Sequence, residues 1–257
     1  MESRYRRRQA VQNIAAVYNS ADPKTRAEGR QWYQAVNEAT NKDIRGTSTD
    51  LRSGAGMVSA VSPSMDWENR NISAIKELHS LGRSQWKDIA QGDRSHLSGM
   101  SISAASTPNL LKAHRIMEGE DPDEVLSRRT APKTNSFFHN IAEPDKSGPV
   151  TIDGRAHDIA VNRLQGWDQH RGISSAALPS GKKTRYEHFE DAYRTAARAI
   201  NEQHGTGLLP HEVQAVTWER GKQLEKQGTT KSGKPRTFGV RRAGQPYVGP
   251  NGLLQEQ

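Results

Sequence analysis

The chain has 257 residues, a formal charge of +8 and only 33% hydrophobic residues, so part of it is expected to lie outside any core. It contains no cysteine, which excludes disulfides, thiolate chemistry and cysteine-type zinc sites. No apolar run approaches the length of a membrane span, and the basic N-terminus lacks the apolar stretch of a secretory signal. These features favour a cytoplasmic protein without membrane contact.

The positive charge is concentrated at the two ends of the chain. Residues 1–8 carry four arginines against Glu2, and residues 226–257 carry six cations against Glu256. Together these ends account for the whole net charge, so residues 9–225 are neutral overall. Nonspecific attraction to phosphate would therefore come largely from the ends, although basic tails also serve simply to keep a protein soluble.

The first half of the chain shows helical spacing of apolar residues and several helix-start signals. A helix is expected over residues 5–18, and a second one from Asp22-Pro23 to about Thr40. Residues 47–61 form a small-residue helix that lets its neighbours approach closely, and Ser62-Pro63 ends it. Asp66 then begins a further helix, which Gly82 closes.

The chain after residue 82 adds seven expected helices, near Trp86, from Thr107-Pro108, from Asp121-Pro122, from Pro132, after Asp153, over 184–204 and from Pro210. Residues 166–183 are expected to form a turn-rich excursion, and the chain beyond residue 227 a disordered basic tail. With almost no strand signal, the pattern predicts an all-α protein. Its expected parts are a basic segment (1–8), a helical domain (9–225) and a flexible tail (226–257).

Lys133 and Asp153 stand at the starts of two predicted helices separated by a polar turn and a short apolar run. If these helices pack side by side, an amine and a carboxylate can face one cleft, which suits attack at a sugar carbon that bears a base. Alternatively, Asp153 is an N-cap and Lys133 a solvated charge. The residues alone favour the alternative, because Asp is among the commonest N-caps.

Pro132-Lys133-Thr134 and the run Thr151 to Ala156 resemble the helix-hairpin-helix DNA glycosylase superfamily. The chain also looks like uncharacterised bacteriophage proteins that share the runs Ser62 to Asn69, Lys133 to Ile141 and Gln214 to Trp218. Arg128-Arg129 stand where the family has hairpin glycines, so these arginines would either contact phosphate through their side chains in place of backbone amides or simply be solvated. Unlike the family, this chain has Gly154-Arg155 after the acid, and its histidine comes only at position 157.

The resemblance implies roles for several side chains. Asp153 would assist departure of the base and stabilise the positive sugar, and Lys133 would attack the anomeric carbon. Nucleobase contacts would come from Trp67, Asn69, Asn140, Gln214 and Trp218, and DNA contacts from Arg128, Arg129, Lys133 and Thr134. No cofactor is expected. The nine histidines are scattered without a metal-binding spacing, so no metal site is expected either.

Structural roles compete with several of these assignments. Trp67 suits a core position, Asn140 suits either a pocket or the end of its helix, and Gln214 could simply fix the last helix through a hydrogen bond. The first functional hypothesis is therefore a phage-encoded, glycosylase-like enzyme that cleaves an N-glycosidic bond or processes a modified base in DNA. The second is a noncatalytic DNA-binding or host-interaction protein with the same fold, and the third is a nucleoside or nucleotide enzyme.

Overall fold

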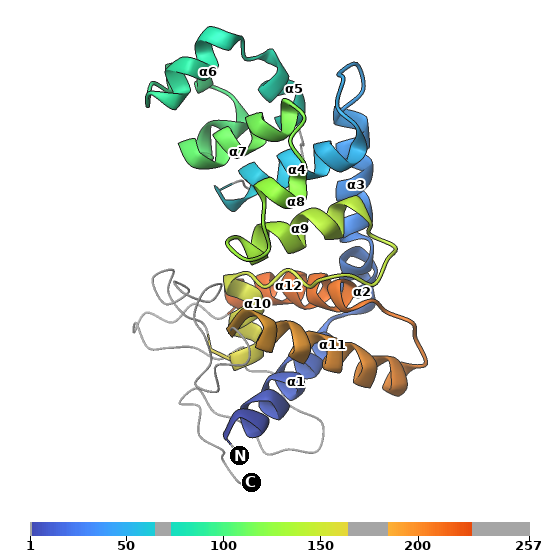
Figure 1. Cartoon of the computed structure of the whole chain (residues 1–257). Coiled ribbons are helices and arrows are strands. Elements are labelled where there is room, and N and C mark those ends of the chain that lie inside the picture. The colour runs from blue at the N-terminus through green and yellow to red at the C-terminus, as the bar shows by residue number, and fades with distance from the viewer. Residues whose placement is uncertain (1, 65–72, 164–184, 228–257) are drawn as a thin grey trace. The chain divides into compact units, whose positions relative to one another are not determined.

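The computed structural model describes residues 2–64, 73–163 and 185–227 (Figure 1). All regular structure in these ranges is helical, with twelve α-helices, three short 3-10 helices and no strand. The predicted all-α class is therefore confirmed. The chain divides into two compact units, each described by itself: residues 1–32 with 146–257, and residues 33–145.

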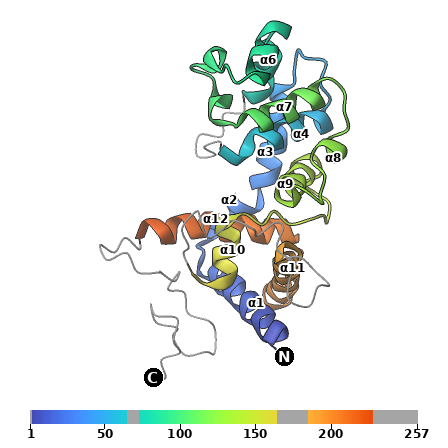
Figure 2. The ribbon, with the colours of Figure 1, turned by 60° about the vertical axis from the view of Figure 1, so that its left-hand side comes forward.

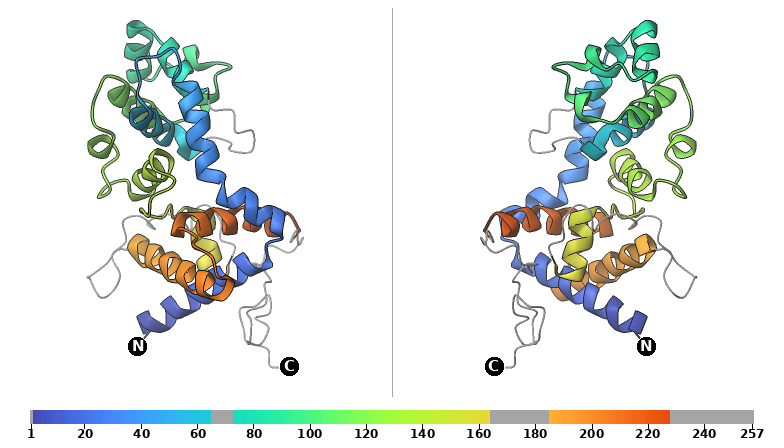
Figure 3. Two further views of the ribbon diagram at one scale, coloured as in Figure 1. Left: turned by 90° about the vertical axis from the view of Figure 1, so that its right-hand side faces the viewer. Right: turned by 90° about the vertical axis from the view of Figure 1, so that its left-hand side faces the viewer.

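The first unit is built from helices that come from both ends of the chain. Its members are α1 (Glu2–Ser20), α2 (Pro23–Arg30), α10 (Gly154–Val161), α11 (Arg185–His204) and α12 (Pro210–Gln227). Helix α1 packs along α11, α10 contacts both α1 and α12 (Figure 2), and α2 lies along α12 (Figure 3). The shared core contains Ile14, Val17, Ile159, Phe189, Tyr193, Ala196, Val213 and Val216.

The second unit is arranged around helix α4. Its helices are α3 (Trp32–Asp43), α4 (Leu51–Val61), α5 (Ala74–Ser80), α6 (Arg83–Ala90), α7 (Thr107–Met117), α8 (Pro122–Val125) and α9 (Pro132–Ala142). The 3-10 helices are η1 (Ser62–Ser64), η2 (Ser95–Leu97) and η3 (Ser101–Ala104).

Helix α4 is buried from Gly54 to Val61 and contacts α5, α7, α8 and α9. A Cβ built on Gly56 would lie 2.8 Å from Pro122, so the predicted close approach to a small-residue helix is confirmed.

Most helix starts agree with the sequence, because their caps are local. Asp22 Oδ1 accepts the Thr25 N–H at 2.8 Å, and proline follows each of Asp22 and Asp121 as expected. Two details differ. The helix expected from Asp22 to Thr40 is divided at Gln31 into α2 and α3. Gly82 directly follows Leu81, the C-cap of α5, where the sequence placed the end of a helix, but its backbone is extended and not left-handed. It is also the N-cap of α6, with its N–H bonded to Gln85 Oε1.

Several sequence expectations concern residues outside the described ranges. Trp67 and Asn69 lie there, as do the excursion over 166–183 and the basic tail beyond residue 227. Helix α1 begins at Glu2, so the basic segment 1–8 is largely the first part of that helix.

Candidate functional site

Asp153 is positioned by an extended run that is fixed to helix α11. The Val150 N–H donates to the carboxylate of Glu190 at 2.9 Å, and the Ile152 N–H donates to Tyr186 Oη at 3.0 Å. The Tyr186 hydroxyl donates in turn to the Val150 carbonyl at 2.9 Å. These two buried side chains therefore satisfy both backbone groups of Val150 and the Ile152 N–H without a neighbouring strand.

The carboxylate of Asp153 makes two hydrogen bonds, one with each oxygen. Oδ1 accepts the Ala156 N–H at 2.8 Å and caps α10, which confirms the N-cap interpretation. Oδ2 accepts the indole N–H of Trp218 at 2.8 Å. The structure thus brings together two of the residues singled out from the sequence, an acid and an aromatic side chain of the first unit.

Cationic side chains lie against the ring of Trp218. The guanidinium carbon of Arg155 is 4.6 Å from the ring centroid and Lys222 Nζ is 4.9 Å from it, both within cation–π range. Trp32 packs at an angle, 6.3 Å between ring centroids. Arg155 also binds Glu225 through two hydrogen bonds of 2.8 Å. The indole is therefore packed among charged side chains, a structural role beside the nucleobase contact expected for it.

The electrostatics of this cluster centre on Arg155. Burial acts to lower the pKa of Arg155, but the hydrogen bonds and negative charge of Glu225 outweigh it, with further attraction from Asp153 and Glu219. The pKa of Arg155 is therefore raised and the guanidinium stays charged next to the acid.

The hairpin residues belong to the second unit, whereas Asp153 belongs to the first. Lys133 and Thr134 lie half-buried in the first turn of α9, and Arg128 and Arg129 are exposed before it. Arg128 Nη1 donates to Ser136 Oγ at 3.2 Å, which holds its side chain back along α9. The second unit thus carries the cations of the expected DNA contact on one helix start and the turn before it.

Of the three amides expected to contact a base, Asn69 lies outside the described residues and the other two are buried. Asn140 in α9 is 1% exposed and Gln214 in α12 is 4% exposed. They belong to different units, Asn140 to the second and Gln214 to the first. Each therefore lies in the interior of its own unit.

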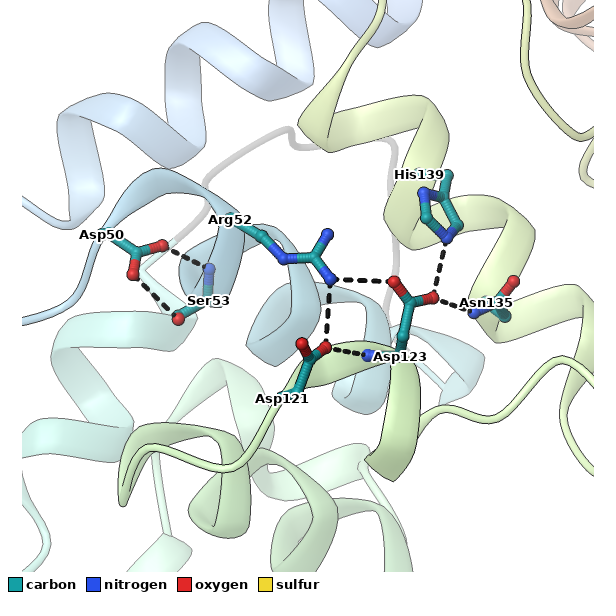
Figure 4. A network of polar contacts seen from close by, with 7 residues as sticks. All are labelled: Asp50, Arg52, Ser53, Asp121, Asp123, Asn135 and His139. Atoms are coloured by element: carbon teal, nitrogen blue, oxygen red, sulfur yellow. Dashed lines mark hydrogen bonds and ion pairs between the residues drawn. The ribbon is translucent and has the colours of Figure 1, made fainter.

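A cluster that the sequence did not reveal links α4, α8 and α9 in the second unit (Figure 4). Asp123 Oδ2 accepts from Arg52 Nη2 at 2.8 Å, while its Oδ1 accepts from Asn135 Nδ2 at 2.9 Å and lies 2.8 Å from His139 Nε2. Arg52 also binds Asp121 at 3.0 Å. The weak local signal for this cluster is the polar pair Asn135 and His139 at helical i, i+4 spacing.

The Asp123 cluster fixes the protonation of its members. Burial alone would raise the pKa of Asp123, but the hydrogen bonds from Arg52, Asn135 and His139 lower it below its ordinary value. Because a carboxylate only accepts hydrogen bonds, Nε2 of His139 is the donor in its contact with Asp123. The carboxylate thus orients the imidazole ring, as an orienting carboxylate does in acid–base chemistry.

No group of three or more His, Cys, Asp or Glu side chains could hold a metal ion within the described ranges. None of the described helices is both long and apolar enough to cross a bilayer. Comparisons with curated proteins and with solved structures give no match. A match to the family described as "Family of unknown function (DUF7178)" covers residues 1–222, and the chain belongs to that family.

Proposed function

We propose that this chain is a DNA glycosylase-like enzyme that acts at a nucleobase N-glycosidic bond, or on a modified base, in DNA. The proposal includes a helix-hairpin-helix fold, in which α8 precedes the hairpin and α9 begins at the hairpin residues Pro132-Lys133-Thr134. The observation that supports it best is the fixed carboxylate of Asp153 at the start of α10, held by the indole N–H of Trp218.

The chemistry follows from the acceptor capacity of that carboxylate. A carboxylate has about four acceptor positions, and the bonds from Ala156 and Trp218 use one on each oxygen. Both oxygens keep a lone pair that can face a positive sugar carbon. Since the two bonds fix the orientation of Asp153 before substrate arrives, the negative charge needs no reorganisation as the positive charge develops.

Replacing Asp153 by Asn tests this role, because Asn is an equally good N-cap and lacks the charge. We expect base release under single-turnover conditions to fall by about 10²–10³-fold, the scale found when one electrostatic contact to a transition state is removed. The substrates are single-stranded and duplex oligonucleotides carrying normal and modified bases. The matched control is Asp50→Asn at the cap of α4, where Asp50 Oδ1 accepts the Ser53 N–H at 2.7 Å.

The outcomes separate clearly. Loss of base release in Asp153→Asn, with activity retained in Asp50→Asn and both variants folded at the assay temperature, supports the proposal; some loss of stability in Asp153→Asn is expected, because one amide oxygen cannot accept from both Ala156 and Trp218. Equal activity of wild type and Asp153→Asn would eliminate Asp153 as the acid.

Lys133 is tested separately as the supporting nucleophile. In the proposed step its amine forms a bond to the anomeric carbon as the bond to the base breaks, and the base leaves with one amine proton. The sugar ring then opens at the C1′–O4′ bond, the ring oxygen takes the second amine proton, and the resulting Schiff base is reduced by borohydride to a stable adduct. We expect a covalent adduct with wild type and none with Lys133→Gln, with Lys112→Gln as the control. Absence of an adduct with wild type would reduce Lys133 to a phosphate contact.

A second candidate function is noncatalytic DNA binding. The two hydrogen bonds of Asp153 also suit a purely structural residue that joins α10 to α12, and the two basic ends of the chain, which carry its net charge, favour attraction to phosphate. This function predicts binding that weakens steeply with salt, depends on residues 1–8 and 226–257, and is unchanged in Asp153→Asn. Release of a base from any of the tested oligonucleotides by this chain would argue against a noncatalytic function.

A further inference from the structure

The hydroxyl of Thr195 joins two arginines of the first unit. Thr195 lies on α11, and its hydroxyl donates to the Asp191 carbonyl at 2.8 Å. The same oxygen accepts from Arg7 Nη2 of α1 at 3.2 Å and from Arg198 Nη2 at 3.4 Å. Since a hydroxyl has one hydrogen and two lone pairs, Thr195 Oγ1 is fully used, and both guanidinium groups are held at one neutral atom.

In the part of the chain that the structure describes, these two cations lack the anionic partners that other arginines have. Neither Arg7 nor Arg198 lies within ion-pair distance of a carboxylate in the described ranges. Arg194, on the neighbouring turn of α11, lies 3.7 Å from Glu190 and 4.0 Å from Asp191. Two like charges on adjacent helices, with no described anion between them, favour the binding of an anion from outside.

The position of the pair favours an extended polyanion. Arg198 is exposed and Arg7 is half-buried, and Arg8 is exposed next to Arg7 on α1. Each guanidinium has five N–H donors, and Thr195 takes one from each. The remaining donors are carried by two helices that pack on each other, so their spacing is fixed before a ligand binds.

We propose that Arg7 and Arg198 form a phosphate-binding surface across α1 and α11 that contacts the sugar–phosphate backbone of duplex DNA. The choice of DNA rests on the proposed function, and the surface itself on the geometry at Thr195. The N-terminal basic segment therefore acts together with α11, a helix that gave no sign of DNA contact in the sequence. Contacts of this kind position a duplex without reading its sequence.

The test measures binding of the full chain to a short fluorescent duplex at several salt concentrations. Affinity falls as salt rises, and we expect this dependence to be shallower in the double variant Arg7→Gln/Arg198→Gln. The magnitude of the slope of log affinity against log salt should decrease by about two, close to 0.9 for each phosphate that is no longer neutralised. Arg45→Gln/Arg83→Gln is the matched control, because it removes the same charge from exposed positions of the second unit. Arg7→Lys/Arg198→Lys should restore the slope, since the slope follows charge.

An unchanged slope in Arg7→Gln/Arg198→Gln, or an equal decrease of the slope's magnitude in the control, would contradict the proposed DNA-binding surface. Competition by millimolar inorganic phosphate at constant ionic strength distinguishes the alternatives. If phosphate displaces DNA from wild type far more strongly than chloride does, the pair is a discrete anion site and the duplex surface is overturned. Because binding is measured without base release, an inactive chain with the expected slopes would refute the enzyme and retain the surface.

Discussion

The indole N–H of Trp218 donates a 2.8 Å hydrogen bond to Asp153 Oδ2, while Oδ1 of the same carboxylate caps α10. One side chain therefore connects the extended run before it, the start of α10 and the middle of α12. Substitution of Asp153 therefore changes both the stability of the fold and any reaction at its carboxylate. Variants that remove one hydrogen bond at a time are needed to separate these two effects.

The first prediction concerns the Asp153–Trp218 bond. Trp218→Phe removes the indole donor and keeps an aromatic ring against Arg155, and Asp153→Ser keeps an N-cap but removes Oδ2. We expect each single variant to lower the free energy of unfolding by about 1.5–3 kcal/mol, the usual range for a hydrogen bond to a charged group. Urea unfolding followed by circular dichroism measures these values.

The double variant tests whether the bond itself is responsible. We expect Trp218→Phe/Asp153→Ser to be less destabilised than the sum of the singles by about 1 kcal/mol, because the same bond is removed in each. If the losses in unfolding free energy are strictly additive, the two residues contribute to stability independently. The hydrogen bond between them would then make no measurable contribution to stability.

The second prediction concerns the stability of the second unit in acid. Burial tends to raise the pKa of Asp123, but hydrogen bonds from Arg52, Asn135 and His139 lower it in the folded chain. A lowered folded-state pKa means that the contribution is complete above the ordinary aspartate value of about 3.9 and is lost as the pH falls through the folded-state pKa. We expect Asp123→Asn to cost about 1 kcal/mol near neutral pH, because the group is partly exposed and screened.

The pH profile distinguishes this network from a general acid effect. The difference in unfolding free energy between wild type and Asp123→Asn should shrink as the pH falls below about 4. Asp145→Asn, at an exposed position outside the network, should give no such dependence. A difference that stays constant with pH would show that the charge of Asp123 is not what stabilises the cluster.

The sequence predicts helix starts well because their signals are local. Asp22, Asp121 and Asp153 each cap the helix that follows them, through contacts two or three residues away. The division at Gln31 is different, because it accompanies the packing of Gly29 against the backbone of Val216. Such a contact between distant segments does not change the spacing of apolar residues, so the sequence pattern cannot predict it.

The candidate site was predictable in its members and not in its contacts. Asp153 and Trp218 were singled out on separate grounds, yet their bond requires α10 and α12 to pack in one particular way. Asp123 and His139 were not singled out at all. Their contact depends on a one-turn helix, α8, that packs beside α9, and the i, i+4 spacing of Asn135 and His139 gives no indication of Asp123 as their partner.

The third prediction concerns Asp43, which is 3% exposed and accepts the Ile75 N–H at 2.8 Å. Burial raises the pKa of Asp43, against the opposing effect of the Ile75 and Lys76 N–H groups. A raised folded-state pKa means that stability falls as the pH rises from about 3.9 through the folded-state value. Asp43→Asn keeps an acceptor without the charge, so we expect equal or greater stability than wild type near neutral pH.

Asp43→Ala provides the contrast, because it leaves the buried Ile75 N–H without an acceptor and should cost about 1–3 kcal/mol. Thermal and urea unfolding of both variants give the comparison. If Asn destabilises as much as Ala, the negative charge itself stabilises the start of α5 and the expected effect of burial is wrong.

The fourth prediction uses two glycines of the first unit. A Cβ built on Gly29 would lie 2.5 Å from Val216 Cα and 2.8 Å from Val216 N, so the backbones of α2 and α12 would have to separate. Helix propensity alone would make alanine better than glycine by about 1 kcal/mol inside a helix. We nevertheless expect Gly29→Ala to destabilise by about 1–3 kcal/mol, because backbone atoms cannot move aside as a flexible side chain can.

Gly207→Ala is the matched control, since a Cβ there would meet nothing within 4 Å and the backbone shows no positive φ. We expect it to be neutral or to stabilise by about 0.4–1 kcal/mol through the unfolded chain. Unfolding of the two variants under the same conditions isolates the contact, because both make the same chemical change in one unit. A Gly29→Ala variant as stable as Gly207→Ala would mean that α2 is not packed against α12 at the close distance described.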